Sequence, residues 1–321
     1  MVGDGRSLSA TVVITDLGIL HLCLSPSGCD EKTWRKGCVN KIPFCKNIFI
    51  PSCDCASLHI VNDFNLTALP DSLVDEMTGL RKVFIRRCNL TALPQGMEKL
   101  EEMVDFEVSY NKLKAFDVNV LKWKKLDKLI LTENNITRYN KMSVWTHPGL
   151  AGIAMAGNVG LQMPATGIFM PSLNYLNFEE NKMAFNSPFE DGSFPQLIDL
   201  YLSGNHLTVF PGKNLHNILY LGIARCGLIH VPKAVLKYHN LQYLDARDNN
   251  ITAVSTDLRE LIAKNKVEAY FSGNLICKDD SSLDCVPLCS KTCWSRNVHN
   301  DGYCDMSCRT RECDYDGGDC T

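Results

Sequence analysis

The residues best suited to chemistry lie at the C-terminal end of the 321-residue chain, where cysteines alternate with aspartates. From residue 289 onward the cysteines are Cys289, Cys293, Cys304, Cys308, Cys313 and Cys320, and the last of them closes the run CDYDGGDC. Thiols at such spacings pair as disulfides or bind a soft metal ion, whereas carboxylates suit a hard cation. The segment therefore predicts a cross-linked module, a metal site, or both.

Two metal sites compete on spacing alone. An EF-hand loop opens with a similar acidic run, but it needs a bidentate acid at loop position 12 and a following helix, and only Thr321 remains. Zinc bound by Cys289, Cys293, Cys304 and Cys308 has acceptable spacing. Zinc would leave two cysteines and the acidic run unused, so it is the weaker alternative to disulfides with a hard cation.

Residues 289–320 closely resemble the Notch-type cysteine-rich repeat, called LNR, in all six cysteines and in the DGGDC ending. The resemblance implies the disulfides Cys289–Cys313, Cys293–Cys308 and Cys304–Cys320. It also implies a Ca²⁺ site formed by Asp301, Asp316 and Asp319 with the carbonyl of Tyr303, and Asn300 is an alternative to Asp301. A segment this short cannot bury enough apolar surface to stay folded without cross-links or a metal. We expect an LNR module at residues 287–321.

The rest of the chain must position this module, and it is repetitive. The stretch LIDLYLSGNHL, residues 197–207, has the spacing LxxLxLxxNxL, and similar stretches recur every 23 or 24 residues. The six residues NLTALP occur at both 65–70 and 89–94, which gives a 24-residue step independently of the leucines. The pattern resembles leucine-rich repeats. We therefore predict an α/β repeat solenoid over residues 57–286, a horseshoe with a parallel concave sheet.

The spacing has a physical reading. The two leucines of each LxL unit enter the core, and the asparagine turns inward, where its amide must bond the backbone because an unpaired buried amide costs about 1–3 kcal/mol. Ten coils are predicted, with these residues at the inward ladder position: Phe64, Cys88, Asn111, Asn134, Asn158, Asn181, Asn205, Cys226, Asn249 and Asn274. Cys88 and Cys226 are interpreted as structural free thiols. Phe64 and the irregular stretch after Asn158 fit the register least well.

Tyrosines gather at the outward strand positions of the later coils. Tyrosine is enriched at binding hot spots, but it also has high strand propensity. The predicted ligand-binding residues on the concave face are Tyr175, Tyr201, Tyr220, Tyr243, Asp245 and Tyr270. We expect them to bind a protein or glycan ligand.

The two ends of the solenoid are rich in cysteine. Residues 29–56 resemble the N-terminal cap of extracellular leucine-rich-repeat proteins, and the pairing of their cysteines is left open. Cys277 and Cys285 are expected to close the last coil. Residues 1–28 are apolar enough for a signal or anchor segment, although Asp16 interrupts them, and a truncated start is the alternative. No later stretch is apolar for the about 18 residues that a spanning helix needs.

Composition restricts the function classes. A formal charge of −3 gives no basic footprint for nucleic acid, and sixteen cysteines favour an oxidising, extracellular location. Four sequons, at Asn65, Asn89, Asn135 and Asn250, share one phase of the repeat and predict glycosylation on an exposed turn.

Catalytic motifs are missing from the sequence, which contains no HExxH, GxSxG, GxGxxG or P-loop lysine. We therefore expect a secreted or cell-surface recognition protein rather than an enzyme, with Ca²⁺ as its ion. The alternative is a regulatory or adaptor protein whose LNR masks a partner or a protease site.

Overall fold

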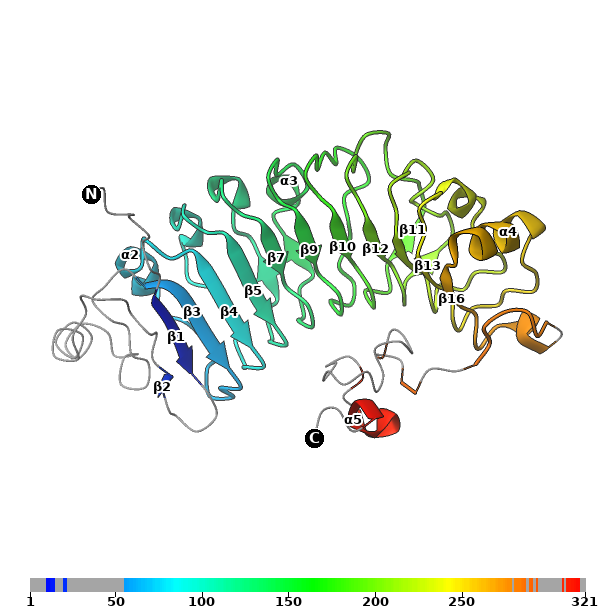
Figure 1. Ribbon diagram of the computed structural model, residues 1–321. Helices are drawn as coiled ribbons and strands as arrows, with labels where there is room; N and C mark the ends of the chain where they lie inside the picture. The colour runs from blue at the N-terminus through cyan, green and yellow to red at the C-terminus, as the bar shows by residue number, and fades with distance from the viewer. Residues whose placement is uncertain are drawn as a thin grey trace, which may run out of the picture. The chain divides into compact units, whose positions relative to one another are not determined.

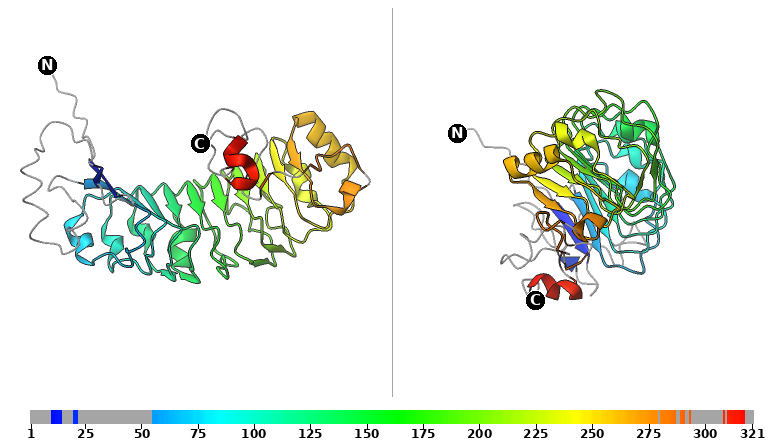
Figure 2. Two further views of the ribbon diagram at one scale, coloured as in Figure 1. Left: turned by 90° about the horizontal axis from the view of Figure 1, so that it is seen from below. Right: turned by 90° about the vertical axis from the view of Figure 1, so that its right-hand side faces the viewer.

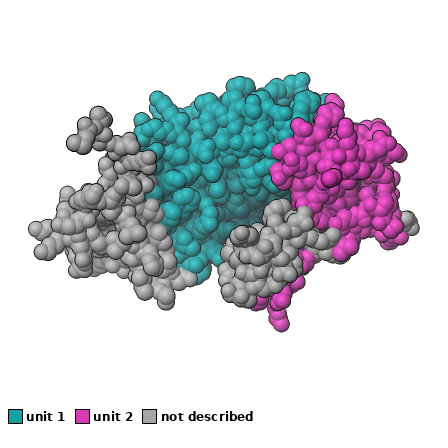
Figure 3. Space-filling model, viewed as in Figure 1, with its two compact units in different colours: residues 1–218 teal, residues 219–321 magenta. Residues whose placement is uncertain are grey.

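The computed structural model describes residues 10–14, 20–21, 55–278, 280–286, 289–290, 293, 308 and 310–317. The chain divides into two compact units, residues 1–218 and residues 219–321 (Figure 3). The boundary falls inside the segment 57–286 predicted as one solenoid, and the same coil repeats in both units. The predicted signal or anchor segment and the predicted N-terminal cap lie outside the described residues, apart from the strands given below.

One face of unit 1 is a sheet of short strands, one from each coil (Figures 1 and 2). Its strands follow each other as β2-β1-β3-β4-β5-β7-β9-β10-β12, and all neighbours are parallel except β1 and β2. Their bounds are β1 Ala10–Ile14, β2 Leu20–His21, β3 Cys55–Val61, β4 Lys82–Arg86, β5 Asp105–Ser109, β7 Lys128–Ile130, β9 Gly152–Ala154, β10 Tyr175–Asn177 and β12 Asp199–Tyr201.

Alternation along each strand separates core from surface. In β12, Leu200 is fully buried and lies opposite Leu176 of β10, whereas Asp199 and Tyr201 on either side are half-buried on the outer face. In β4, Val83 and Ile85 are buried in the same way. The LxL pattern therefore determines which side chains face outward, as the sequence predicts.

The return segments of unit 1 lie on the other side of the coil from the sheet (Figure 2). They contain short helices and two-residue strands: α2 Ser72–Glu76, η2 Met97–Lys99, β6 Ala115–Phe116, η3 Val120–Lys122, β8 Arg138–Tyr139, α3 Lys141–Trp145, β11 Ala184–Phe185 and β13 His206–Leu207. Large aromatic side chains fill the space that these segments enclose. Trp123 is fully buried, stacks 5.1 Å from Phe106, and donates its indole N–H to the Met97 carbonyl at 3.0 Å. The core therefore lies between the sheet and the return segments.

The predicted asparagine ladder is confirmed in unit 1. The Asn205 side chain donates to the carbonyls of Phe178 at 2.8 Å and Leu202 at 2.9 Å, and it accepts from the Met183 N–H at 3.0 Å. The bonds to Phe178 and Met183 join neighbouring coils, and the bond to Leu202 lies within one coil. Equivalent bonds are made by Asn111, Asn134, Asn158 and Asn181.

Unit 2 continues the same coil. Its parallel strands are β14 Tyr220–Gly222, β15 Tyr243–Asp245 and β16 Glu268–Tyr270, and its helical segments are η4 Lys233–Lys237, α4 Thr256–Asn265, η5 Leu275–Lys278, η6 Arg311–Cys313 and α5 Asp314–Gly317. Helix α4 begins where the Ser255 hydroxyl accepts the Leu258 N–H at 3.3 Å. Asn249 and Asn274 extend the ladder here, and Cys277–Cys285 forms a disulfide after the last strand.

Three ladder positions lack an asparagine. Cys88 and Cys226 are buried free thiols, and each donates to the carbonyl two residues earlier at 3.3 Å. Phe64 differs from the prediction, because its side chain is exposed rather than turned inward. The first coil has one more residue than the second between the strand and the shared NLTALP motif, and this extra residue places Phe64 outside the ladder.

No helix in the described part of the chain is long and apolar enough to cross a bilayer.

Candidate binding face

The strand face of unit 1, meaning the outward side chains of β3 to β12, carries two of the predicted tyrosines. Tyr175 of β10 lies opposite Asp199 of β12, and Asn177 lies opposite Tyr201. The rings of Tyr175 and Tyr201 are 5.8 Å apart and both are half-buried. This pair, the Tyr175–Tyr201 patch, offers two tilted aromatic faces on a rigid sheet.

Asp199 gives this patch an electrostatic feature that the sequence did not single out. Its Oδ1 is buried and has no hydrogen-bond partner among the described residues, and burial raises the pKa of its carboxyl. The pKa of Tyr175 is also raised, chiefly by burial and further by Glu179 and Asp199. Oδ1 is enclosed by neighbouring atoms, so it is not itself open to a ligand.

Beside Tyr175 the strand face carries only small residues. The outward positions of β9 hold Gly152 and Ala154, and Gly152 lies between Lys128 of β7 and Tyr175 of β10 in register. A Cβ at Gly152 would lie 3.6 Å from the Lys128 side chain, an ordinary van der Waals contact.

Two carboxylates line the edge where the strands end. Glu133 and Glu180 have positive φ angles, and their carboxylates lie over the glycine of the next coil. A Cβ at Gly157 would meet Glu133 at 2.4 Å, and a Cβ at Gly204 would meet Glu180 at 2.4 Å. The pKa of Glu133 is raised by burial and by the charge of Glu180. This edge of the face is therefore acidic.

Two ion pairs lie on the strand face at β4 and β5, and sequence reasoning did not select them as site residues. Lys82 Nζ is 2.8 Å from Asp105, and Arg86 bonds Glu107 through two nitrogens, with Nη2 2.6 Å from Oε2. The sequence held a signal for one pair, because Lys82 and Asp105 are opposite charges at equivalent outward positions of neighbouring coils, whereas Arg86 reaches diagonally to Glu107, which lies opposite Phe84.

The other predicted tyrosines lie in unit 2 and differ in exposure. The rings of Tyr220 and Tyr243 are 6.2 Å apart, and those of Tyr243 and Tyr270 are 5.9 Å apart. Tyr243 and Tyr270 are only 3% and 2% exposed, whereas Tyr220 is half-buried and its hydroxyl donates to Gln242 at 3.3 Å. Asp245 is also buried, and Arg247 bonds it through Nε and Nη2 at 2.8 Å each. The outward position of Tyr243, Asp245 and Tyr270 therefore does not make them accessible.

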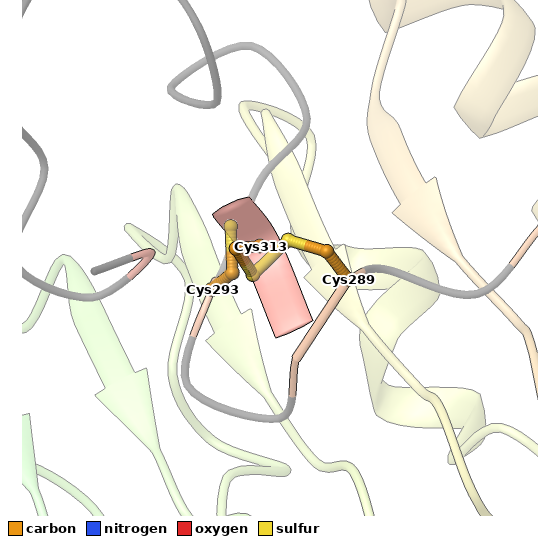
Figure 4. Close-up of side chains that lie close together, drawn as sticks. All are labelled: Cys289, Cys293 and Cys313. Atoms are coloured by element: carbon orange, nitrogen blue, oxygen red, sulfur yellow. A yellow bond between two sulfur atoms is a disulfide. The ribbon is translucent and has the colours of Figure 1, made fainter. Parts of the chain in front are cut away.

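The C-terminal cysteines form a compact sulfur cluster (Figure 4). The disulfides are Cys289–Cys313 and Cys293–Cys308, the two pairings that the LNR resemblance implies for these residues. The sulfurs of Cys289, Cys293 and Cys313 lie within 4.8 Å of one another. Their oxidation excludes the zinc alternative, because zinc binds thiolates.

Of the residues predicted to bind Ca²⁺, Asp316 lies in α5, and Asp301, Tyr303 and Asp319 lie outside the described residues. The predicted third disulfide, between Cys304 and Cys320, also lies outside them.

Three of the four sequons directly follow a ladder residue, and Asn65 follows Phe64, which lies outside the ladder. Asn65, Asn135 and Asn250 are exposed. Asn89 is half-buried, and its side-chain amide donates to the Phe64 carbonyl at 2.6 Å. Three of the four predicted glycosylation sites are therefore accessible at the asparagine itself.

Comparison with known proteins supports the leucine-rich-repeat fold and the LNR segment. Residues 286–321 match the family model of the Notch LNR domain. No curated protein matches the sequence. The functional domain of InlJ from Listeria monocytogenes, described as including a cysteine ladder, is similar in structure with a TM-score of 0.51 and 18% identity. The match covers 72% of this chain and 49% of InlJ, so this chain spans about half the length of that structure.

Two further solved structures are less similar. YopM from Yersinia enterocolitica WA-314 has a TM-score of 0.46 at 20% identity, over 70% of this chain and 48% of YopM. The leucine-rich-repeat ectodomain of the receptor kinase GASSHO1/SCHENGEN3 from Arabidopsis thaliana has a TM-score of 0.46 at 17% identity, over 69% of this chain and 26% of that one.

The repeated coil, the asparagine ladder and the InlJ likeness show the fold, and the family model covers the cysteine-rich end. The chain has a leucine-rich-repeat fold, and its residues 286–321 match the family model of the Notch LNR domain.

Proposed function

We propose that this protein is a secreted or cell-surface recognition protein whose strand face in unit 1 binds a protein ligand at the Tyr175–Tyr201 patch. One observation carries the proposal: two half-buried tyrosine rings lie 5.8 Å apart on the outward face of neighbouring strands, where Tyr175 is paired in register with Asp199. Rigid aromatic side chains dominate protein interfaces because they bury a large area and lose little entropy.

The chemistry of the patch indicates what it binds. The tyrosine faces would attract a cation, and the half-buried Asp199 adds a carboxylate beside them. Glu133 and Glu180 extend the negative potential along the edge of the face. We therefore expect the ligand to place a basic side chain between Tyr201 and Asp199.

The extracellular location is proposed from sulfur chemistry. Disulfides such as Cys277–Cys285 and Cys289–Cys313 persist in oxidising compartments. Glycosylation at Asn65, Asn89, Asn135 and Asn250 belongs to the same proposal, and glycosidase treatment should lower the mass of the secreted protein. An unshifted mass would count against it.

The binding proposal is tested by screening the secreted full chain against a panel of extracellular proteins. A ligand captured by the wild type should lose at least tenfold in affinity for Tyr175→Ser/Tyr201→Ser, because both aromatic anchors are removed. The matched control is Met142→Ser/Phe169→Ser, which removes two exposed apolar side chains from the return segments. Loss in the control with retention in the tyrosine variant would reject the patch, and capture of glycans alone would reject a protein ligand.

We further propose that the LNR segment binds Ca²⁺ through Asp301, Tyr303, Asp316 and Asp319. The disulfides leave oxygen atoms as the ligands available, and Ca²⁺ prefers six to eight oxygens. When bound, the ion would neutralise the acidic run and stabilise a segment with little core. Calorimetric titration of the full chain with Ca²⁺ should show binding that Asp316→Asn/Asp319→Asn abolishes, and equal heats in both proteins would reject the site.

A further inference from the structure

The strand face of unit 1 carries a second chemical feature, distant in sequence from the tyrosines, at β3 to β5. Four cations belong to the second coil, namely Arg81, Lys82, Arg86 and Arg87. Lys82 and Arg86 lie on the outward side of β4, and Arg87 follows with a positive φ. Their acidic partners are Asp105 and Glu107 of β5.

In each ion pair the carboxylate is more deeply buried than the cation. The Glu107 side chain is 4% exposed and also accepts from the Ser109 hydroxyl at 2.6 Å, whereas the Arg86 side chain is 53% exposed. Asp105 is 16% exposed and Lys82 is 47% exposed. The carboxylates therefore form the floor and the cations the surface, so an approaching molecule meets positive groups first.

The buried carboxylates also fix the cations in place. Glu107 accepts from Nε and Nη2 of Arg86, and no described residue accepts a hydrogen bond from Nη1. A side chain already held in one geometry loses less entropy when it binds. The free nitrogen gives Arg86 a donor for an external anion.

Two aromatic side chains belong to the same part of the face. Phe84 lies between Lys82 and Arg86 on β4, and its ring is 4.5 Å from that of His59. Tyr110 is 51% exposed, with the Arg87 guanidinium 5.7 Å over its ring. The pKa of His59 is lowered, first by burial and then by Lys82 and Arg86, in accord with a positive local potential.

We propose that this cationic patch, formed by Lys82, Arg86 and Arg87 with Phe84 and Tyr110, binds an acidic segment of a partner protein. Lys82 and Arg86 are four residues apart on one side of a strand, about 13 Å along it. An extended segment with two carboxylates at the same spacing would match both cations. The inference rests on the proposed use of the strand face and adds a second, oppositely charged contact to it.

The test uses the full chain and a fluorescein-labelled dodecapeptide whose glutamates lie four residues apart, followed by fluorescence anisotropy. We expect the wild type to bind, and binding to weaken several-fold as NaCl rises from about 50 to about 300 mM. Lys82→Gln/Arg86→Gln/Arg87→Gln should lose about tenfold in affinity, since three exposed contacts are removed. A peptide with glutamine in place of glutamate should not bind.

Controls separate this contact from general charge and from misfolding. Lys122→Gln/Lys124→Gln/Lys125→Gln removes the same three charges from exposed positions of the return segments and should bind the peptide as the wild type does. Lys82→Gln/Arg87→Gln leaves the Arg86–Glu107 pair intact and should lose about threefold.

Equal binding by the triple variant, or an equal loss in the control, would overturn the proposal. Preference of the same residues for a sulfated oligosaccharide over the peptide would also overturn it, because the partner class would be wrong. Tyr175→Ser/Tyr201→Ser should keep its affinity for the peptide, so failure here is distinguishable from failure of the tyrosine patch.

Discussion

Single buried amides join neighbouring coils of this protein. The Asn205 side chain satisfies two carbonyls and one N–H that are all buried, and two of these three bonds cross between coils. A thiol at the same position, as in Cys226, offers one weak S–H donor, whereas the asparagine amide offers two N–H donors and a strong acceptor. The asparagine is therefore the stronger connector.

Asn205→Ala should lower the free energy of unfolding by about 3 kcal/mol, because several buried backbone groups lose their partner. Urea denaturation measures the change. Asn217→Ala is the matched control: Asn217 is exposed and makes one bond, to the Pro195 carbonyl at 2.9 Å, so its loss should be under about 1 kcal/mol. Equal losses would contradict the ladder as a stabilising element.

A buried histidine gives the fold a defined pH dependence. His147 is 1% exposed, its Nε2 lies 3.1 Å from the Trp123 carbonyl, and its Nδ1 accepts the Gly149 N–H at 3.2 Å. Burial lowers the pKa of His147 below its usual 6.5, against the opposing effect of the Trp123 carbonyl. Protonation would place a second N–H against that of Gly149.

The unfolded chain gains this proton near pH 6.5, and the folded chain gains it only at lower pH. Stability is therefore fully present above about pH 6.5 and falls below it, by up to about 1.4 kcal/mol per pH unit for this group. His147→Gln removes the titration, so its destabilisation relative to wild type should be smaller at pH 5.5 than at pH 7.5. A difference that is constant or grows on acidification would contradict the assignment.

At the scale of the element, the turn after each strand has a backbone conformation as regular as that of the strand. The residue before each ladder position has a positive φ, and the acidic side chain of one coil lies over the glycine of the next. Gly204 is such a position, with φ +73° and the Glu180 carboxylate where a Cβ would be. At these positions a carboxylate of one coil occupies the space beside a glycine of the next coil.

Gly204→Ala and Gly192→Ala should each destabilise by about 1–2 kcal/mol, because φ is positive at both positions. The added Cβ at Gly204 would meet only the carboxylate of the exposed Glu180, the end of a flexible side chain that can rotate away, and nothing lies within 4 Å of a Cβ at Gly192. Adding Glu180→Ala to Gly204→Ala should therefore leave the loss unchanged. Thermal unfolding of the four proteins tests this, and a clear recovery in the double variant would show that the cost is steric instead.

Element-scale patterns explain how much could be read from the sequence. The LxxLxLxxNxL spacing predicts the strands, the ladder and the outward positions, because those depend on local alternation. Helix α4 and the return segments vary in length and type, so the repeat does not predict them. The first coil, where Phe64 was misplaced, shows that one added residue shifts a position out of phase.

Accessibility of the predicted site could not be read from the same pattern. Tyr175 and Tyr243 both point outward by alternation, yet the first is half-buried and the second is 3% exposed. Exposure depends on neighbours in other coils, such as the Tyr220 and Tyr270 rings on either side of Tyr243. The ion pairs of Lys82 and Arg86 depend likewise on the coil that follows.

At the scale of the whole molecule, binding is proposed to use one face of the coil while the ladder and core keep that face rigid. The strand face of unit 1 has a cationic patch at β4 and an acidic, aromatic patch at β10 and β12. Such an arrangement favours one orientation of a partner with the opposite charge order, because like charges would face each other in the reverse orientation.

Masking the face with a glycan tests this account most directly. Asp199→Asn/Tyr201→Thr creates an N-glycosylation sequon on β12, and Pro164→Asn creates one at a return segment through the existing Thr166. Both glycosylated proteins are assayed for capture of the extracellular ligand that the wild type selects. We predict that the β12 glycan abolishes capture and the return-segment glycan leaves it unchanged. Capture that survives the β12 glycan and is lost with the return-segment glycan would contradict binding at the strand face.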